Sequence, residues 1–343
     1  MKKRITSMFL VLLMVLSLMP ATVQASPASS GSGTKDDPYL IATAQDLVDF
    51  RNEVNASKKK STSTLCAKLT KDIDLSNLEG DWEPSGKATN TYDDYVAYGG
   101  TFDGGGHTIS GLIINNSKQY QALFGYVKGG EIKGLTVAGS VTTSTKSSAY
   151  AAGIVGYGSP VTIENCVNQA TVTAKQKGYI AGITAYAGGT GSSISGCKNQ
   201  GDIVAADGYV GGIVATTSST TSVTVKNCIN SGAITCTGTP NSYGGNVGGV
   251  GGSISGTSTV ERCGNTGTVS STMKRTGGVA GSVSGTIQSF FNTCDVTGIY
   301  SLGGIAGITG SKNTKISDCY NWGNITCNVP AVVFKDTNAK GVG

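Results

Sequence analysis

The sequence predicts an all-β fold, a right-handed parallel β-helix with a small helical cap at its N-terminal end. Two repeated motifs carry this prediction. The first, apolar-x-x-Cys-x-Asn-x-Gly-x-(Ile/Val)-Thr, occurs six times and is clearest in its last copy, residues 316–326. The second has the form GGIVG and precedes each copy of the first, as in AAGIVG at residues 151–156. The copies recur about every 30 residues, the period that is typical of solenoid proteins.

Aligning the copies places like residues in columns. We expect the cysteines to pack as small buried side chains and the asparagines to form an amide ladder between coils. Glycines four residues after the cysteines, such as Gly201 and Gly232, are expected to supply positive φ angles. Phe290 replaces the cysteine in the fifth copy. The two ladder columns are Cys166, Cys197, Cys228, Cys263 and Cys319, and Asn168, Asn199, Asn230, Asn265, Asn292 and Asn321.

Each repeat is predicted to contribute three short strands. Its GGIVG-like, VTIENC-like and AxIT-like segments are rich in β-branched residues and are separated by Gly, Asn and Ser. Runs so short and so interrupted by glycine do not fit helical periodicity. Parallel strands stacked coil on coil at about 4.8 Å would place the Ile and Val columns in the interior.

The first 25 residues are typical of a secretory signal peptide. A basic start at Lys2–Arg4 is followed by an apolar run around residues 8–16 and by a small-x-Ala cleavage site at Val23–Ala25. We therefore expect an extracellular protein, secreted or at the cell surface. The apolar run is too short to span a membrane, so we expect no transmembrane segment in the mature chain. The mature chain keeps 23 basic and 21 acidic residues, which gives no argument for nucleic-acid binding.

Three further segments follow the signal peptide. Residues 26–36 are rich in Ser and Gly and are predicted to be a flexible linker. Residues 37–98 are predicted to form the cap and the first coil, with a strand at 37–41, a helix at 43–54 that Thr43 and Asp46 cap, and a strand at 65–75. A cap covers the apolar end of a solenoid. Residues 99–343 are predicted to be the repeats, with a strand pair at 100–114.

Nine cysteines in a secreted chain favour disulfides in general, but here we expect free thiols. Five of them fall in one inward column, where parallel stacked side chains do not offer the crossed geometry of a disulfide. Cys66, Cys236, Cys294 and Cys327 lie off this column, and the sequence does not decide whether any of them form a bridge.

The run GTFDGGGHTISGLII at 100–114, then ALFGYV and IKGLTV, and the repeated GGIxG and NCxNxGxIT segments resemble the GLUG-motif proteins. The resemblance covers residues 33–327. These extracellular repeat proteins come mostly from Gram-positive bacteria and include regions of immunoglobulin A metallopeptidases. The resemblance implies a pectate-lyase-like β-helix with a secreted or surface role, and it implies no activity.

The sequence offers no convincing catalytic residues, metal ligands or cofactor site. The single histidine, His107, excludes a His-Glu-x-x-His zinc site and is expected to flank a turn beside Asp103. The columns that contain Glu164 and Asp202 do not place carboxylates on neighbouring coils, which acid–base cleavage of a polysaccharide requires. Carboxylates from different columns could still converge in a groove, so a polysaccharide lyase or hydrolase stays as an alternative.

Three tyrosines are candidates for glycan binding. Tyr150, Tyr179 and Tyr209 occupy equivalent places before successive GGIVG-type motifs and should stack over three coils. An aromatic strip beside polar loops suits sugar rings. The alternative is that the stacked rings only stabilise the sheet surface.

The sequence therefore predicts a non-enzymatic extracellular module, expected to be a monomer, that presents a solenoid surface for adhesion. Its expected partner is a host or cell-wall glycan or a surface protein. A second alternative is a structural stalk for a downstream domain, because residues 340–343 resemble the start of another repeat and the chain is then expected to be truncated.

Overall fold

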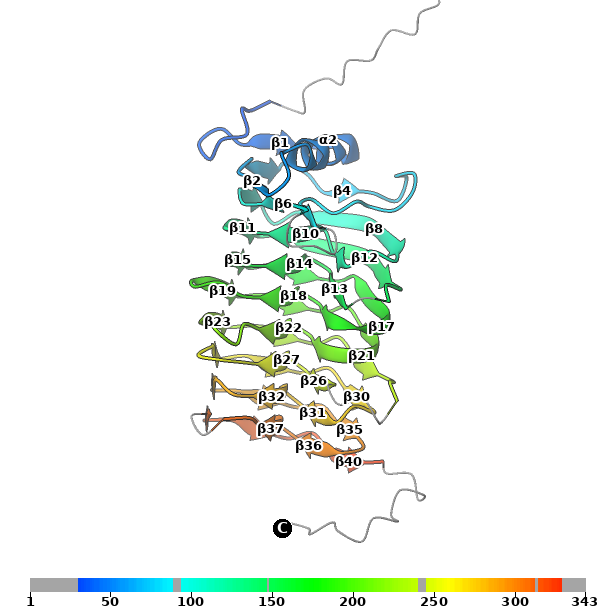
Figure 1. Cartoon of the computed structure of the whole chain (residues 1–343), viewed down its shortest axis with the longest axis vertical. Coiled ribbons are helices and arrows are strands. Elements are labelled where there is room, and N and C mark those ends of the chain that lie inside the picture. The colour runs from blue at the N-terminus through cyan, green and yellow to red at the C-terminus, as the bar shows by residue number, and fades with distance from the viewer. Residues whose placement is uncertain (1–29, 89–93, 147, 240–244, 312–313, 329–343) are drawn as a thin grey trace, which may run out of the picture.

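The computed structural model describes residues 30–88, 94–146, 148–239, 245–311 and 314–328. They form a parallel β-solenoid of about nine turns with about 30 residues per turn and one short helix, which confirms the predicted fold class (Figure 1). The expected signal peptide at 1–25 and the partial repeat at 340–343 lie outside the described residues.

Three sheets run along the solenoid, and all their pairings are parallel except one between β5 (Lys87–Ala88) and β6 (Tyr95–Tyr98). Sheet A holds one strand from each turn. Its strands are β1 (Tyr39–Ile41), β3 (Ala67–Leu69), β7 (Thr101–Asp103), β11 (Gly130–Lys133), β15 (Val161–Glu164), β19 (Ser192–Ser195), β23 (Val223–Lys226), β28 (Thr259–Glu261), β33 (Thr286–Gln288) and β38 (Lys315–Ser317).

Sheet B has the same one-strand-per-turn organisation, and β5 joins its edge. Its parallel strands are β2 (Ser61–Ser63), β6, β10 (Phe124–Val127), β14 (Val155–Gly158), β18 (Thr184–Ala187), β22 (Val214–Thr217), β27 (Gly251–Ile254), β32 (Ala280–Val283) and β37 (Ala306–Thr309).

Sheet C forms the third side of each turn, and this side is divided into up to three segments. They are β4 (Ile73–Asp74), β8 (Thr108–Asn116), β9 (Tyr120–Gln121), β12 (Thr136–Thr143), β13 (Ala149–Ala152), β16 (Val167–Asn168), β17 (Thr171–Ala181), β20 (Lys198–Asn199), β21 (Ile203–Gly211), β24 (Ile229–Asn230), β25 (Ile234–Cys236), β26 (Asn246–Gly248), β29 (Gly264–Asn265), β30 (Val269–Ser271), β31 (Arg275–Gly277), β34 (Phe291–Asn292), β35 (Val296–Gly298), β36 (Ser301–Gly303), β39 (Tyr320–Asn321) and β40 (Ile325–Cys327).

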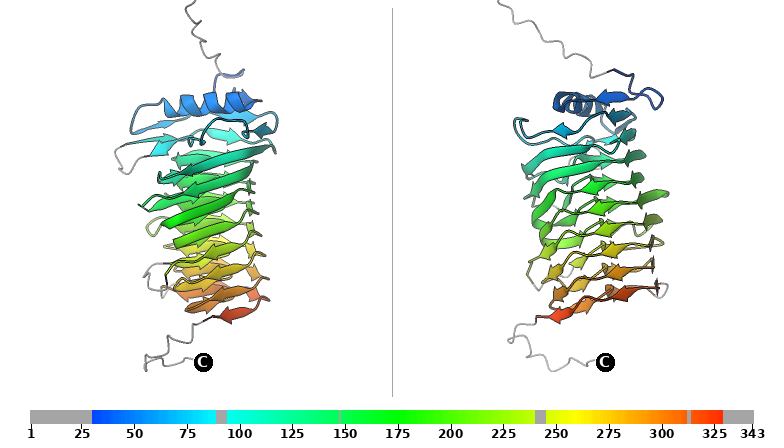
Figure 2. Two further views of the ribbon diagram at one scale, coloured as in Figure 1. Left: turned by 90° about the vertical axis from the view of Figure 1, so that its right-hand side faces the viewer. Right: turned by 180° about the vertical axis from the view of Figure 1, so that it is seen from behind.

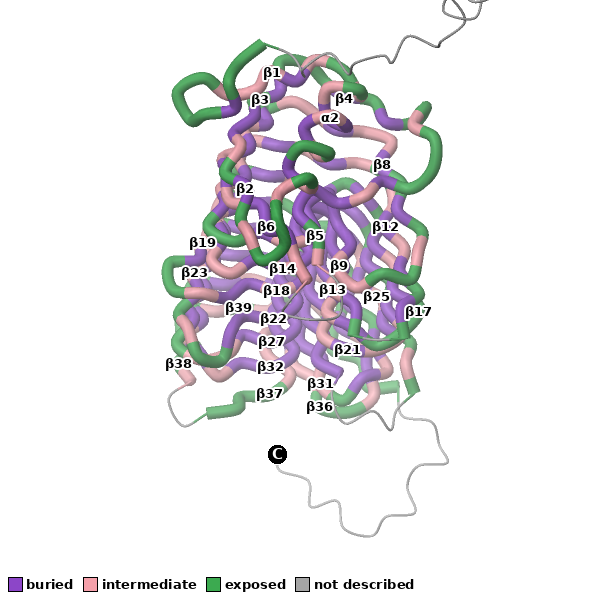
Figure 3. Tube along the Cα trace, turned by 45° about the horizontal axis from the view of Figure 1, so that its top comes forward, coloured by how far each residue is buried: buried purple, intermediate pink, exposed green. Residues whose placement is uncertain are grey.

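The sequence columns are also columns in space. In sheet A, Ile132 pairs with Ile163 and Ile163 with Ile194, and all three side chains are fully buried. The tube in Figure 3 shows buried residues along the stack as far as the last described coil, which is largely exposed. The core is thus a continuous stack of aliphatic side chains, in which those of each coil pack on those of the next.

The helix α2 (Ala44–Asn55) lies across the N-terminal end of the stack (Figures 1 and 2). The Thr43 hydroxyl accepts the Asp46 amide at 3.1 Å, and the Asp46 carboxylate accepts the Thr43 amide at 3.0 Å, so a capping box starts the helix. Phe50 is fully buried and packs against the rings of Tyr98 and Phe102 at 5.9 and 5.7 Å. The helix therefore covers the end of the first coil, and an aromatic cluster packs between them.

Residues 30–36 differ from the expected flexible linker. The Ser32 amide donates to the Asp37 carbonyl at 3.0 Å, and the Cys66 amide donates to the Gly33 carbonyl at 2.7 Å. Gly33 is buried, and a Cβ there would lie 2.8 Å from the Tyr39 ring. This stretch thus forms a turn that is hydrogen-bonded to the cap. Its Ser and Gly residues are small enough to fit there.

The glycine column does not supply positive φ angles, contrary to expectation. Gly201 and Gly232 are not among the positive-φ residues, but a Cβ on Gly201 would lie 2.0 Å from the carbonyl oxygen of Ala170 on the preceding coil. Close approach of the coils is therefore what requires glycine at these positions. The left-handed residues stand immediately before the cysteine column instead, at Gly134, Asn165, Gly196, Asn227, Arg262, Ser289 and Asp318.

The asparagine column forms a continuous amide ladder. Each Nδ2 donates to the Oδ1 of the next asparagine, at 2.8 Å from Asn168 to Asn199 and at 2.7 to 2.8 Å in the following rungs as far as Asn321. Each Nδ2 also donates to the carbonyl two residues later in its own coil, as Asn199 does to Gly201 at 2.9 Å. A Cβ on Gly182 would lie 2.1 Å from Asn199 Oδ1, so the GGIVG-type motif has glycine where the ladder passes.

Candidate functional site

Seven tyrosines form two adjoining columns at the border of sheets B and C, which we call the double tyrosine column. The first column, on sheet C, is Tyr120, Tyr150, Tyr179 and Tyr209, each paired in register with the next. The second column, on sheet B, is Tyr126, Tyr157 and Tyr186. All seven side chains are half-buried, so their outer edges reach solvent.

The rings pack in a herringbone. Within the first column, neighbouring rings are nearly parallel, with centroids 4.7 to 5.1 Å apart. In the second column, the centroids are 5.3 and 4.3 Å apart. Between columns the rings meet edge to face, as Tyr150 and Tyr157 do at 5.3 Å and 78°. Both arrangements are favourable for aromatic quadrupoles, so the columns stabilise the coils that hold them.

Small residues let the rings settle against the backbone. Ala122, Ala152 and Ala185 are fully buried beneath them, and Tyr150 and Tyr179 pack on this alanine cluster. Burial, followed by the neighbouring Tyr186, raises the pKa of the Tyr157 hydroxyl. The Tyr157 hydroxyl is therefore a neutral hydrogen-bonding group at physiological pH.

The three tyrosines predicted from the sequence, Tyr150, Tyr179 and Tyr209, are stacked with one another. Sequence reasoning missed Tyr120, at the start of the same column, and the whole second column. The missed signal was a tyrosine directly after the Gly or Ala that ends the GGIVG-type motif, in FGYV, VGYG and TAYA. It recurs in only three coils, after which Thr216, Ser253 and Ser282 follow in register.

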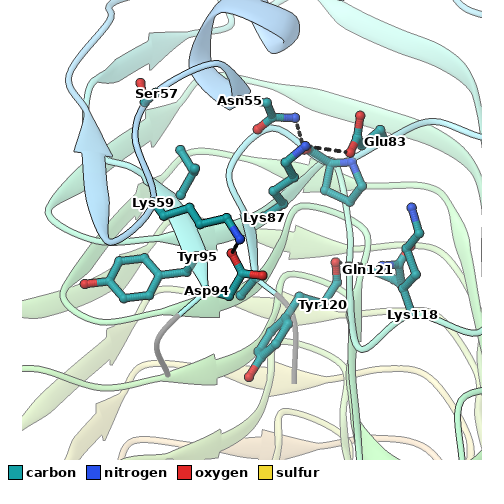
Figure 4. A pocket seen from close by; sticks show the side chains of 13 residues that line it. Asn55, Ser57, Lys59, Glu83, Lys87, Asp94, Tyr95, Lys118, Tyr120 and Gln121 are labelled. Atoms are coloured by element: carbon teal, nitrogen blue, oxygen red, sulfur yellow. Dashed lines mark hydrogen bonds and ion pairs between the residues drawn. The ribbon is translucent and has the colours of Figure 1, made fainter. Parts of the chain in front are cut away.

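A cavity of about 490 Å³ opens at the N-terminal end of the double tyrosine column (Figure 4). Tyr120, the first ring of the first column, lines it together with Tyr95 of β6. The Tyr95 ring lies 5.1 Å from that of Tyr126, which in turn meets Tyr120 at 6.2 Å. The aromatic surface therefore continues without a break from the columns into the cavity.

Charged side chains surround the rest of the cavity. Lys59 pairs with Asp94 at 2.9 Å, and Lys87 pairs with Glu83 at 3.1 Å. A third ammonium, that of Lys118, also lines the space.

The Asn55 amide fixes the cavity wall. It donates to the Pro84 carbonyl at 3.0 Å and accepts the Gly86 amide at 2.9 Å. The helix α2 and the loop before β5 are thereby joined at the cavity. This part of the site is built by the cap, not by the repeats.

Other candidates for chemistry are arranged as structural contacts. His107 Nδ1 lies 3.2 Å from Asp72 Oδ1, which also accepts the Thr108 amide, and the Asp103 carboxylate accepts the Gly105 amide at 2.9 Å. Within the described ranges, no group of three or more His, Cys, Asp and Glu side chains is placed to hold a metal ion. His107 and Asp103 each secure a turn of the first coils.

On the outer face of sheet A, charges of opposite sign alternate from coil to coil. Lys68 pairs in register with Asp103, Asp103 with Lys133, and Lys133 with Glu164. Opposite charges on neighbouring strands are mildly stabilising. Here a lysine separates the two carboxylates, and the column gives no pair of acids on neighbouring coils.

All nine cysteines are free thiols. Parallel stacking predicted this for the five in the column, whereas the sequence left it open for Cys66, Cys236, Cys294 and Cys327. Burial raises the pKa of the Cys236 thiol to about 12 and also raises that of Cys263. Cys166, Cys197, Cys228 and Cys263 are fully buried in the core, while Cys319 is half-buried on the last described coil. The four buried thiols of the column are packing groups of the core.

No family model matches the chain. It is 29% identical over 138 residues to a protein of Evansella cellulosilytica named as a Gly-rich membrane protein, covering 38% of this chain and 14% of that protein. It is 30% identical over 229 residues to halomucin of Haloquadratum walsbyi, covering 57% of this chain and 2% of halomucin. The matches thus span only small parts of these long relatives. The described part of this chain contains no helix with the length and hydrophobicity needed to cross a bilayer.

Among solved structures, the fold is similar to a crystal structure of a Bacteroides ovatus protein named as an immunoglobulin A1 protease. The TM-score is 0.56 at 21% identity, over 85% of this chain and 77% of that one. At this identity the similarity shows a shared fold alone, and it is consistent at that level with the resemblance to the β-helical regions of immunoglobulin A metallopeptidases. This chain is therefore a β-solenoid with a tyrosine-lined cavity beneath its N-terminal cap.

Proposed function

We propose that this protein is an extracellular, non-enzymatic repeat module of the GLUG type that binds glycans at the double tyrosine column. The observation that carries the proposal is the cavity of about 490 Å³ at the N-terminal end of that column. Its volume lies in the range of small-ligand sites, and it combines aromatic walls with polar side chains. The extracellular location rests on the signal-peptide pattern in residues 1–25.

Because the rings within a column are stacked on one another, we expect a sugar ring to bind at the end of the columns. Rings inside a column, such as Tyr150 and Tyr179, have neighbouring rings stacked on their faces. Tyr120 stands at the end of the first column, next to Tyr150, and lines the cavity. A sugar packs its apolar face on an aromatic face, so Tyr120 and Tyr95 are the main contact residues. The other tyrosines offer edges and hydroxyls to a longer chain.

Glycan-array binding of the mature protein tests the proposal. Tyr120→Ala and Tyr95→Ala should each weaken binding of a positive glycan by about tenfold, the effect of losing one aromatic contact. Tyr300→Ala is the matched control, because Tyr300 is 40% exposed on a distant coil outside the columns. Replacing Tyr150, Tyr179 and Tyr209 together should weaken binding of long oligosaccharides more than of short ones.

Two outcomes would favour the other functions that the sequence left open. Absence of binding across a broad array would contradict the proposal and favour a structural stalk. Release of oligosaccharides from pectin- or mucin-type glycans would favour a polysaccharide lyase or hydrolase. Product formation would then have to be traced to carboxylates that converge from different columns.

A further inference from the structure

We propose that the cavity selects a sugar that carries a carboxylate, such as a uronic or sialic acid at the end of a glycan. This inference rests on the proposed glycan binding and specifies the sugar class. Three groups on the cavity wall carry it: the Lys118 ammonium, the Gln121 amide and the ring of Tyr120. They come from residues 118–121, which end in β9, so one short segment presents all three.

Lys118 provides the positive charge. The other two lysines of the cavity are already neutralised, Lys59 by Asp94 at 2.9 Å and Lys87 by Glu83 at 3.1 Å. No carboxylate within the described ranges forms an ion pair with Lys118, whose side chain is exposed at the cavity. A ligand carboxylate there would make a charge-assisted hydrogen bond, which is stronger than a bond between neutral groups.

The surroundings add to this positive field. Lys128 lies over the Tyr95 ring, with its ammonium 5.8 Å from the ring centroid. The C-terminal end of α2, which carries partial negative charge, also reaches the cavity through Asn55. That effect fades within one helical turn. The cavity lining holds three lysines and two carboxylates, so its net charge of +1 favours an anion.

Gln121 provides a neutral polar contact. Its side chain is only 2% exposed, and its Nε2 donates to the Tyr120 carbonyl at 2.9 Å. Its Oε1 is buried and has no hydrogen-bond donor within the part of the chain that the structure describes. A buried acceptor without a donor is unfavourable, so a sugar hydroxyl that donates to this oxygen on a small side-chain rotation gains an otherwise missing bond.

Paired ligands that share a neutral core test the inference. Calorimetry on the mature protein would compare 3′-sialyllactose with lactose, and tri-galacturonic acid with its methyl ester. The acidic member of at least one pair should bind about tenfold more tightly, and added NaCl should reduce this preference. The two pairs separate sialic from uronic acids.

Lys118→Gln should abolish the preference for the acidic ligand, so that both members of a pair bind about equally. Lys315→Gln is the control, because it removes a lysine on the last described coil far from the cavity. Gln121→Met should weaken both members of a pair. If this variant does not fold, the Lys118→Gln comparison decides alone.

The outcomes separate the two proposals. Equal binding of acidic and neutral ligands by the unaltered protein would overturn the selection of acidic sugars and leave glycan binding intact. An acidic preference that survives Lys118→Gln would also overturn the inference. Absence of binding by every ligand, together with a negative array, would overturn both proposals.

Discussion

Asn199 shows how one side chain joins three parts of the solenoid. Its Nδ2 donates to Asn230 Oδ1 at 2.7 Å and to the Gly201 carbonyl at 2.9 Å, and its Oδ1 accepts from Asn168 at 2.8 Å. The side chain is fully buried, and Gly182 stands against its amide without room for a Cβ. The asparagine of one sequence motif and the glycine of the other are therefore the two partners of a single contact.

Asn199→Ala should lower the free energy of unfolding by about 3 kcal/mol, because it leaves buried donors and acceptors on both neighbouring coils without partners. Urea denaturation would measure this loss. Asn321→Ala is the matched comparison, since Asn321 is the last rung and is only half-buried. Its loss should be less than half as large, and equal losses would contradict the role of the continuous ladder.

The two kinds of glycine position lead to opposite expectations. Gly201→Ala should destabilise the protein by several kcal/mol, because its Cβ would stand 2.0 Å from a backbone oxygen that cannot move alone. Gly196→Asn should change stability by less than about 1 kcal/mol, because Gly196 has φ +63° and Asn165 and Asn227 hold the same conformation at equivalent positions. Thermal unfolding of both variants would check this, and a harmless Gly201→Ala would refute the close-approach argument.

The column structure could be predicted from the sequence because identical residues at a constant period must meet the same environment. The cause of each glycine was harder to assign, since positive φ and close approach both favour glycine. The column of left-handed residues is partly visible in the sequence, because Gly and Asn tolerate this conformation and occupy positions 134, 165, 196 and 227. Arg262 and Ser289 obscure it, and only the backbone angles reveal that they adopt it as well.

At the scale of elements, the cap decides the stability of the first coils. Phe50 of α2 packs against the rings of both Tyr98 and Phe102. Its burial is complete. The helix itself could be predicted from its capping residues and apolar face, whereas its contacts with β6 and β7 depend on where the first coil places its aromatic side chains.

Phe50→Ala should open the N-terminal coils without unfolding the rest of the solenoid. Removing a buried phenylalanine costs about 3–5 kcal/mol. In a stack where each coil contacts only its neighbours, that loss stays local. Hydrogen exchange followed by mass spectrometry should show faster exchange in β1, β3 and β6 and unchanged exchange in β22 and β27. Uniformly faster exchange along the chain would contradict this local effect.

The candidate site shows the limit of repeat-based prediction. The stacking of Tyr150, Tyr179 and Tyr209 follows from their shared place in the repeat. The cavity does not, because Lys59, Lys87 and Asn55 belong to the cap, which occurs once in the chain. Periodicity carries no information about contacts between a unique segment and the first repeat.

At the scale of the whole molecule, the buried thiols report how the stack opens. Cysteines are distributed from Cys66 in the first coils to Cys327 in the last described coil, and six of the nine are buried. Among the described residues, the last coil packs only on the coil before it, and its Ile316 and Tyr320 are 40% and 48% exposed. In a one-dimensional stack, opening should therefore begin at this coil and move toward the cap.

Thiol labelling in increasing urea would follow this order. At pH 8 without urea, iodoacetamide should modify Cys327 first and leave Cys166, Cys197 and Cys228 unmodified, because only exposed thiolates react. With urea, Cys263 should become reactive before Cys197, and Cys197 before Cys166. Mass spectrometry of the cysteine peptides would give each midpoint. A single shared midpoint would mean that the solenoid unfolds as one cooperative unit.

The same thiols predict how stability responds to alkaline pH. Burial raises the pKa of Cys236 from 9.0 to about 12, so the folded state holds the proton more tightly than the unfolded chain does. The contribution of Cys236 to the free energy of unfolding has its full value below pH 9. It is lost as pH rises toward 12, because the thiol ionises first in the unfolded chain. Urea midpoints measured between pH 8 and pH 11 should therefore fall. Cys236→Ala should flatten this decline, whereas Cys327→Ala, which removes an exposed thiol, should leave it unchanged.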